Sequence, residues 1–395
     1  MRRTLAVLAL IVTATSLPGQ QASFEQQFSH QELDEFIAEL YEDYEPPVAE
    51  YPVDVYQLLV ETTHPSGVTT PVRVQLFIPQ TGTDAIRGSY LFAPGSTGLI
   101  NPCRPSREHE AGIRWGLYRA HVLSLAGQGF VGILPDYMGF EDWNLIQPYF
   151  HAESEARLIV DVTVAVHAFL SEDPEEVRID GGLADLTRVA AGYSQGGHAA
   201  FAAADRNDLF PAGLELDGII GYGPTTAVDA LFLEYSSVAP MVVEAYRTIY
   251  GEERFDPAHI LAPELAESLA YDTTRQCVGG MQSYYPTKPT ELFSVGFLKS
   301  LWAETLELTH PDIHAVMEEN RAGLSGHRVP TLILQGTNDI VVNRFTQDAF
   351  VVALRELGSH VRYLVYEGAR HDTRQIAFPR VIQWIDALSA GSNTP

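Results

Sequence analysis

Eight short apolar runs along the chain predict the strands of a β-sheet. The first two runs alternate apolar and polar residues and lie close together in the chain, which favours an antiparallel pair at one edge of the sheet. The later runs are apolar throughout, as buried parallel strands are. The runs occupy residues 53–62, 72–79, 89–94, 130–136, 188–194, 217–224, 331–336 and 362–368.

Stretches of helical length separate the later runs, and one more precedes the first run. Strands that alternate with helices imply right-handed crossovers and a parallel sheet. We therefore predict an α/β fold with a mostly parallel, twisted sheet and helices on both of its faces. The predicted helices lie at residues 31–44, 109–127, 151–170, 195–207, 344–358 and 374–388.

One interval, residues 225–327, interrupts this alternation. It contains no convincing strand and shows helical patterning broken by several prolines. A loop of that length without structure of its own is rare, so we expect a helical cap inserted over one end of the sheet. The predicted organisation is a signal peptide at 1–20, the first part of the core at 21–224, the cap at 225–327 and the second part of the core at 328–395.

The N-terminus has the layout of a secretory signal peptide. Two arginines are followed by an apolar run at residues 5–12 and by small residues up to Gly19. The run is too short for the roughly 20 apolar residues of a membrane span. We expect a secreted or periplasmic protein without stable membrane insertion.

Composition narrows the possible partners. The chain has 51 acidic and 25 basic residues and a net charge of −26, which repels nucleic acids and anionic membrane surfaces. Cys103 and Cys277 form an even pair, and in an exported protein they are a candidate disulfide. No dinucleotide fingerprint, phosphate-binding loop or Cys/His cluster occurs, so we expect no cofactor and no metal. Nothing in the sequence indicates an oligomeric state.

The run at 188–194 ends in GYSQG, and an alanine-rich helical stretch follows. A serine becomes accessible for chemistry where a strand turns sharply into a helix, and its neighbours at positions −2 and +2 must then be small. Gly192 and Gly196 occupy those positions around Ser194. The pattern predicts a nucleophile elbow; the alternative is a glycine-rich turn with an inert serine.

A nucleophilic serine needs a histidine base and an acid that orients the base, and in this fold they follow in the order Ser, Asp or Glu, His. Asp339 stands in a polar turn directly after the run at 331–336, and His371 follows the run at 362–368. Both positions are at the carboxyl ends of strands, where open α/β sheets bind their ligands. We therefore predict a triad of Ser194, Asp339 and His371.

Each partner has rivals. Asp217 and Asp372 are alternatives to Asp339, and His360 is the alternative to His371. His360 precedes a strand instead of following it, which places it at the opposite edge of the sheet.

Acyl transfer also requires two N–H donors for the oxyanion. The backbone of Gln195, directly after the nucleophile, is the first candidate. The second is the backbone of Ser96, in the loop after the run at 89–94, with Thr97 as the alternative. Residues 136–140 are expected to form part of the pocket wall.

With these residues assembled, the chain resembles the α/β-hydrolase superfamily and, within it, the secretory lipase family of fungal lipase-A-like proteins and their bacterial relatives. The resemblance implies triad roles for Ser194, Asp339 and His371, a disulfide between Cys103 and Cys277, and a cap that shapes an acyl-binding cleft. It rests on residues 90–106, 135–140, 151–166, 192–200, 335–342 and 368–372.

The expected function is carboxylic-ester hydrolysis, as by an esterase or lipase, through a Ser-His-Asp triad and an acyl-enzyme intermediate. A serine peptidase or amidase with the same triad is one alternative. A non-catalytic binding protein on a hydrolase fold is the other, because such folds host many functions.

Overall fold

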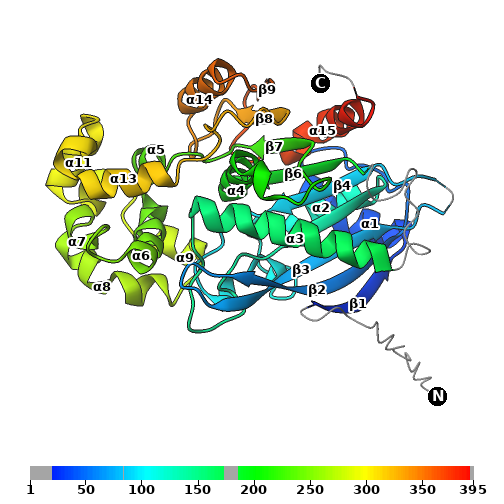
Figure 1. Ribbon diagram of the computed structural model, residues 1–395, viewed down its shortest axis with the longest axis horizontal. Helices are drawn as coiled ribbons and strands as arrows, with labels where there is room; N and C mark the ends of the chain where they lie inside the picture. The colour runs from blue at the N-terminus through cyan, green and yellow to red at the C-terminus, as the bar shows by residue number, and fades with distance from the viewer. Residues whose placement is uncertain (1–19, 83, 173–185, 392–395) are drawn as a thin grey trace.

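The computed structural model describes residues 20–82, 84–172 and 186–391 (Figure 1). In this part of the chain nine strands form one sheet, in the order β1-β2-β3-β5-β4-β6-β7-β8-β9. The strands are β1 (Gln20–Phe28), β2 (Val53–Thr63), β3 (Thr69–Pro79), β4 (Gly88–Ala93), β5 (Phe130–Pro135), β6 (Arg188–Tyr193), β7 (Gly218–Tyr222), β8 (Thr331–Gly336) and β9 (Val361–Tyr366).

The sheet is antiparallel at one edge and parallel elsewhere. β1, β2 and β3 pair antiparallel with their neighbours, and β3 pairs antiparallel with β5. From β5 to β9 all pairs are parallel, which confirms the predicted mostly parallel sheet. The edge strand β1 was not predicted, because its sequence QQASFEQQF has no apolar alternation.

Helices cover both faces of the sheet (Figure 1). On one face α3 (Ala152–Glu172), α4 (Gln195–Asp205) and α14 (Arg344–Glu356) contribute to a common apolar core. On the other face α1 (His30–Ile37), α2 (Tyr118–Ala126) and α15 (Arg374–Ser389) contribute to a second core. This two-sided arrangement agrees with the prediction.

Two predicted helices are shorter than expected. The helix expected at 31–44 ends at Ile37 and continues as a 3₁₀ turn, Ala38–Tyr41. The helix expected at 109–127 begins only at Tyr118, because the Glu108 carboxylate accepts the backbone N–H groups of the three residues at 116–118. This side chain caps α2 from outside and holds the preceding residues in a loop.

Residues 225–327, which we call the helical segment, lie between β7 and β8 and stand at one end of the sheet (Figure 1). They have an apolar core of their own, which also includes Leu99, Tyr149 and Phe150 of the sheet domain. The α-helices of the segment are α5 (Val228–Glu234), α6 (Ala239–Tyr250), α7 (Pro257–Ile260), α8 (Pro263–Thr273), α9 (Val278–Tyr284), α10 (Pro289–Leu292), α11 (Val295–Trp302), α12 (Leu306–Thr309) and α13 (Pro311–Glu319).

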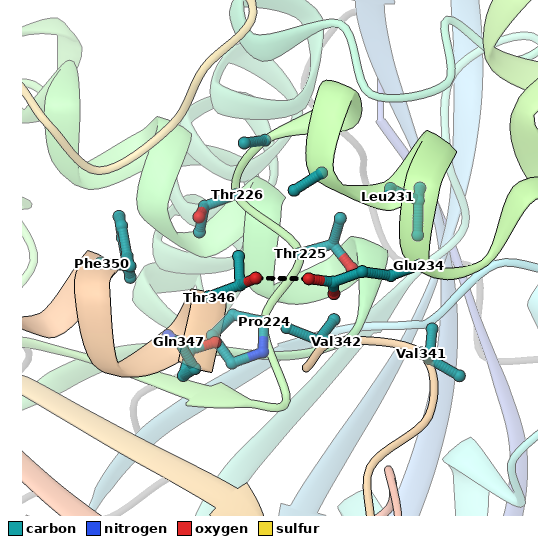
Figure 2. Close-up of a pocket in the computed structure, with 12 residues that line it drawn as sticks. Pro224, Thr225, Thr226, Leu231, Glu234, Val341, Val342, Thr346, Gln347 and Phe350 are labelled. Carbon is teal, nitrogen blue, oxygen red and sulfur yellow. Dashed lines mark hydrogen bonds between the residues drawn. The ribbon is translucent and has the colours of Figure 1, made fainter. Parts of the chain in front are cut away.

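The helical segment is attached to the loop after β8. Glu234, the last residue of α5, accepts a hydrogen bond from the Asn343 backbone N–H at 2.7 Å. It also accepts one from the Thr346 hydroxyl at the start of α14 (Figure 2). A small pocket of about 20 Å³ lies beside this contact. The first helix of the segment is thereby fixed to the turn that carries Asp339.

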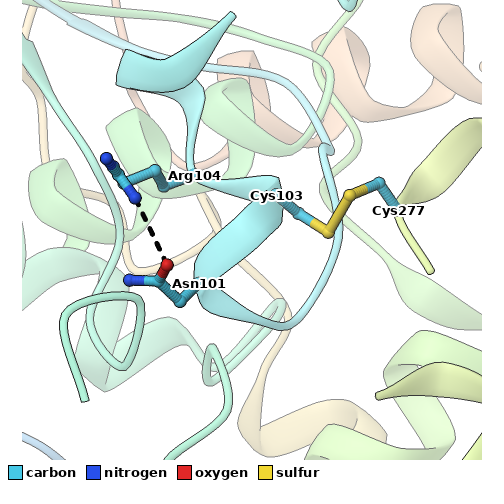
Figure 3. The surroundings of a disulfide bond; sticks show 4 residues. All are labelled: Asn101, Cys103, Arg104 and Cys277. Atoms are coloured by element: carbon cyan, nitrogen blue, oxygen red, sulfur yellow. Dashed lines mark hydrogen bonds between the residues drawn. A yellow bond between two sulfur atoms is a disulfide. The ribbon is translucent and has the colours of Figure 1, made fainter. Parts of the chain in front are cut away.

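A disulfide attaches the segment to the loop after β4. Cys103 and Cys277 are bonded, with a Cα–Cα distance of 5.4 Å (Figure 3). The next residue, Val278, donates its backbone N–H to the carbonyl of Thr97 at 2.8 Å. The N-terminus of α9 is therefore held against the loop that contains Ser96.

The predicted signal peptide, residues 1–20, lies outside the described residues except for Gln20, where β1 begins. Within the described residues, no helix has both the length and the apolar composition that crossing a bilayer requires.

Candidate active site

Ser194 occupies the sharp turn between β6 and α4. Its backbone has φ 55° and ψ −114°, a conformation that residues with a side chain rarely adopt. Its N–H donates to the Tyr222 carbonyl of the neighbouring strand at 3.0 Å, and its carbonyl accepts from Gly197 N–H at 3.0 Å. The turn is therefore held from both sides in the conformation expected of a nucleophile elbow.

The two glycines around the serine are required by direct backbone contacts. A Cβ on Gly192 would lie 1.8 Å from the Gly196 carbonyl oxygen, and a Cβ on Gly196 would lie 1.8 Å from the Ala93 carbonyl oxygen. The following Gly197 faces Pro224, and a Cβ on Gly197 would lie 2.5 Å from the Cβ of Pro224. No side chain fits at these positions, because strand and helix meet there without intervening space.

The structure brings Asp339 and His371 together. His371 Nδ1 lies 2.8 Å from Asp339 Oδ2, and the Asp339 side chain is buried. The same carboxylate accepts the backbone N–H groups of Val341 and Val342 at 2.8 and 2.9 Å, and Gln335 Nε2 at 3.1 Å. Since an ionised carboxylate only accepts, His371 donates through Nδ1–H, and in the neutral imidazole the lone pair is then on Nε2.

Ser194 and His371 line one cavity. Within the described residues His371 Nε2 has no hydrogen-bond partner, so Ser194 and His371 face the same space without a hydrogen bond between them. Such contacts often tighten only when substrate is bound.

Gly223 lies directly beneath the imidazole of His371. Its φ is +50°, and a Cβ there would lie 2.9 Å from His371 Nδ1. Sequence reasoning missed this glycine, which permits the close approach of the ring.

The rival residues have other partners. Asp372 binds the buried guanidinium of Arg374 through both carboxylate oxygens. Burial raises the pKa of Asp372, but the charge and hydrogen bonds of Arg374 lower it to about 2. Asp217 accepts the backbone N–H of Arg188, and His360 immediately precedes β9, at the opposite end of that strand from His371.

Of the two candidate oxyanion donors, Ser96 lines the cavity and Gln195 directly follows Ser194, which also lines it. Gln195 is the first residue of α4, where backbone N–H groups have no intrahelical acceptor. Ser96 lines the cavity, and its Oγ is 2.5 Å from the hydroxyl of Tyr149. The alternative donor, Thr97, has its carbonyl bound to Val278 of the helical segment.

The cavity has a volume of about 300 Å³, and six Phe, Tyr and Trp side chains contribute to its wall. Among the described residues no carboxylate lines it, although the whole chain carries a net charge of −26. The expectation that residues 136–140 form part of this wall was wrong, since Tyr137 points behind the loop and donates to the Pro94 carbonyl at 2.6 Å. The lining residues are Ser96, Arg114, Trp115, Tyr118, Tyr149, Phe150, Tyr193, Ser194, Thr225, Leu231, Tyr235, Val238, Val278, Gly279, Gln282, Val341 and His371.

Among the described residues, no three or more His, Cys, Asp or Glu side chains are grouped so that they could hold a metal ion.

The sheet order, the helices on both faces and the strained serine between β6 and α4 define an α/β-hydrolase fold. Solved structures agree. The esterase LipA from Xanthomonas oryzae, described as rice cell wall degrading, has a TM-score of 0.72 and 18% identity over 94% of this chain and 96% of its own. A putative hydrolase from Legionella pneumophila has a TM-score of 0.69 and 17% identity over 94% and 97%.

Candida antarctica lipase A is similar as well, with a TM-score of 0.65 and 16% identity over 95% of this chain and 82% of its own. At these identities the similarity establishes the fold. No protein-family model and no curated protein sequence matches the chain.

Proposed function

We propose that the protein is a serine hydrolase that cleaves carboxylic esters. The observation that carries the proposal is that Ser194 and His371 line one cavity and that the buried Asp339 carboxylate orients the imidazole at 2.8 Å. The similar structures named an esterase and a lipase support ester chemistry on this fold.

In the proposed reaction, Ser194 Oγ attacks the ester carbonyl and His371 Nε2 accepts its proton. Asp339 stabilises the imidazolium through Nδ1–H. The backbone N–H groups of Gln195 and Ser96 bind the negative oxygen of the tetrahedral intermediate. His371 then gives the proton to the leaving alcohol, and water repeats the sequence on the acyl-enzyme to release the acid.

The size of the cavity favours small esters. A volume of about 300 Å³ is at the lower limit of the roughly 300–1,000 Å³ that is typical of small-molecule sites. The helical segment, which we propose acts as the cap, is attached on two sides of this cavity by the disulfide and by Glu234. We therefore expect short acyl chains to be preferred over long ones.

We further propose that the protein is exported and that residues 1–20 are its signal peptide. The disulfide supports this assignment, because such bonds persist in oxidising compartments.

The test is a series of p-nitrophenyl esters with acyl chains from acetyl to palmitoyl, assayed with wild type, Ser194→Ala and Ser283→Ala as an exposed control. We expect Ser194→Ala to lose at least about four orders of magnitude in kcat and to lose labelling by a fluorophosphonate. The control should retain both. Ester turnover by Ser194→Ala would refute the proposed nucleophile.

Two further outcomes would change the assignment. Faster cleavage of aminoacyl amides than of esters would identify a peptidase or amidase with the same triad. A wild-type protein without labelling and without turnover would identify a binding protein.

A further inference from the structure

A buried polar network lies directly behind the elbow. Its centre is Glu155, in the first turn of α3, whose side chain is 1 % exposed. One carboxylate oxygen accepts Gln195 Nε2 at 2.8 Å and the backbone N–H of Phe150 at 3.2 Å. The other oxygen lies 2.5 Å from Nδ1 of His198, which is fully buried in α4.

Both ring nitrogens of His198 face acceptors. Nδ1 faces the Glu155 carboxylate, and Nε2 lies 2.7 Å from the backbone carbonyl oxygen of Asn320. A carbonyl only accepts, so Nε2 donates to Asn320, and Nδ1 forms the contact with the carboxylate. Asn320 directly follows α13, and its side chain accepts the backbone N–H of Ala152 at 2.9 Å.

The network reaches two parts of the proposed active site. Gln195 is the residue whose backbone N–H would bind the oxyanion. Phe150 lines the cavity and has a φ of 57°, so its backbone depends on contacts that hold it. Through His198 and Asn320, the same carboxylate also joins the elbow helix to the end of the helical segment.

We propose that Glu155 is a positioning residue for the oxyanion hole, acting on Gln195 and Phe150, and that His198 connects this positioning to the helical segment. The inference rests on the proposed esterase function. The geometric argument is that Gln195, in the first turn of α4, donates to a carboxylate that two further contacts hold in place, the Phe150 backbone N–H and His198 Nδ1. A purely structural contact would be served as well by apolar side chains, because desolvation of a buried ionic pair offsets much of its attraction.

The decisive comparison uses Glu155→Met, Glu155→Gln and Gln195→Met. Methionine keeps the side-chain length and removes the acceptor, whereas glutamine retains one carbonyl oxygen for Gln195 and Phe150. We expect Glu155→Met and Gln195→Met to lower kcat by about 10- to 100-fold, because misplacement of about 1 Å has effects of that size. KM should stay within about twofold of wild type, since the cavity wall is otherwise intact. Glu155→Gln should recover most of kcat.

A second readout separates positioning from folding. The affinity for an alkylboronic acid, which forms a tetrahedral adduct on the nucleophile, should fall by the same factor as kcat/KM. Glu244→Met is the matched control: Glu244 is another buried glutamate, in α6, and it pairs with Arg247. This control should leave kcat, KM and boronate affinity unchanged even if its melting temperature falls.

An unchanged kcat in folded Glu155→Met, or a rise in KM alone, would overturn the proposal. If Glu155→Met does not fold, Gln195→Met decides the question, because it leaves the contact between Glu155 and His198 in place. Failure of the proposed function is a different result: wild type would then neither turn over esters nor react with a fluorophosphonate, and the positioning role would fall with it.

Discussion

Gly196→Ala should inactivate the protein through a single backbone collision. The added Cβ would lie 1.8 Å from Ala93 O, 2.5 Å from Ala93 C and 2.7 Å from Pro94 O. Ordinary contact begins at 3.4 Å, so the deficit at the closest atom is 3.4 − 1.8 = 1.6 Å. Neither acceptor moves easily, because Ala93 is paired with Gly192 in the sheet and Pro94 O accepts from the buried Tyr137 hydroxyl.

A displacement of this size exceeds the roughly 1 Å that costs a factor of about 100 in rate. We expect kcat/KM of Gly196→Ala to fall at least 100-fold, and overpacking to lower the free energy of unfolding by about 1–3 kcal/mol. Ester turnover and urea unfolding measure the two effects. The control is Gly296→Ala, an exposed helical glycine whose Cβ would meet nothing within 4 Å, and it should retain full activity. Turnover of Gly196→Ala within about threefold of wild type would refute the steric argument.

Two more predictions follow from buried titratable groups. Asp339→Asn should lower kcat by about 10⁴-fold, because His371 loses the partner that fixes its tautomer. Asp372→Asn should lower kcat far less. Equal losses of kcat in the two variants would contradict the choice of Asp339 as the acid. Burial, aided by the charge of Arg206, lowers the pKa of His151 from 6.5 to about 4. Between pH 6.5 and about pH 4 the folded state therefore binds fewer protons than the unfolded chain. The free energy of unfolding falls as the pH drops through this range, and at about pH 5 the loss is about 2 kcal/mol. His151→Gln should remove this loss. The measurement is the free energy of unfolding of wild type and variant at about pH 7.5 and at about pH 5. If the difference between the two proteins is the same at both pH values, His151 is not the cause of the loss.

The elements that the sequence predicted well are those whose physics is local. Every buried strand of the parallel region carries an uninterrupted apolar run, since both of its faces are covered, and such a run is visible in sequence. The elbow was predictable for a similar reason: the two collisions at Gly192 and Gly196 exclude every other residue type, so the spacing of the glycines records the geometry.

The elements that the sequence did not reveal depend on distant partners. β1 forms because β2 offers it a free edge, and its own polar residues give no sign of a strand. The late start of α2 depends on the Glu108 carboxylate. It accepts N–H groups that a helix starting earlier would bond to its own carbonyls. Gly223 is required because the imidazole of His371, a residue far away in the sequence, packs directly against it in the folded protein.

The proposed active site likewise depends on contacts with residues that are distant in the sequence, here those of the helical segment. The proposed oxyanion loop, elbow and acid turn follow three separate strands, β4, β6 and β8, and each continues beyond the last residue paired in the sheet. The segment touches each of them: Val278 contacts the oxyanion loop, Glu234 the acid turn, and Asn320 the elbow helix through His198. It therefore does more than contribute residues to the cavity wall. Because the three tips share one attached body, changes at these three contacts should act on kcat as well as on substrate binding.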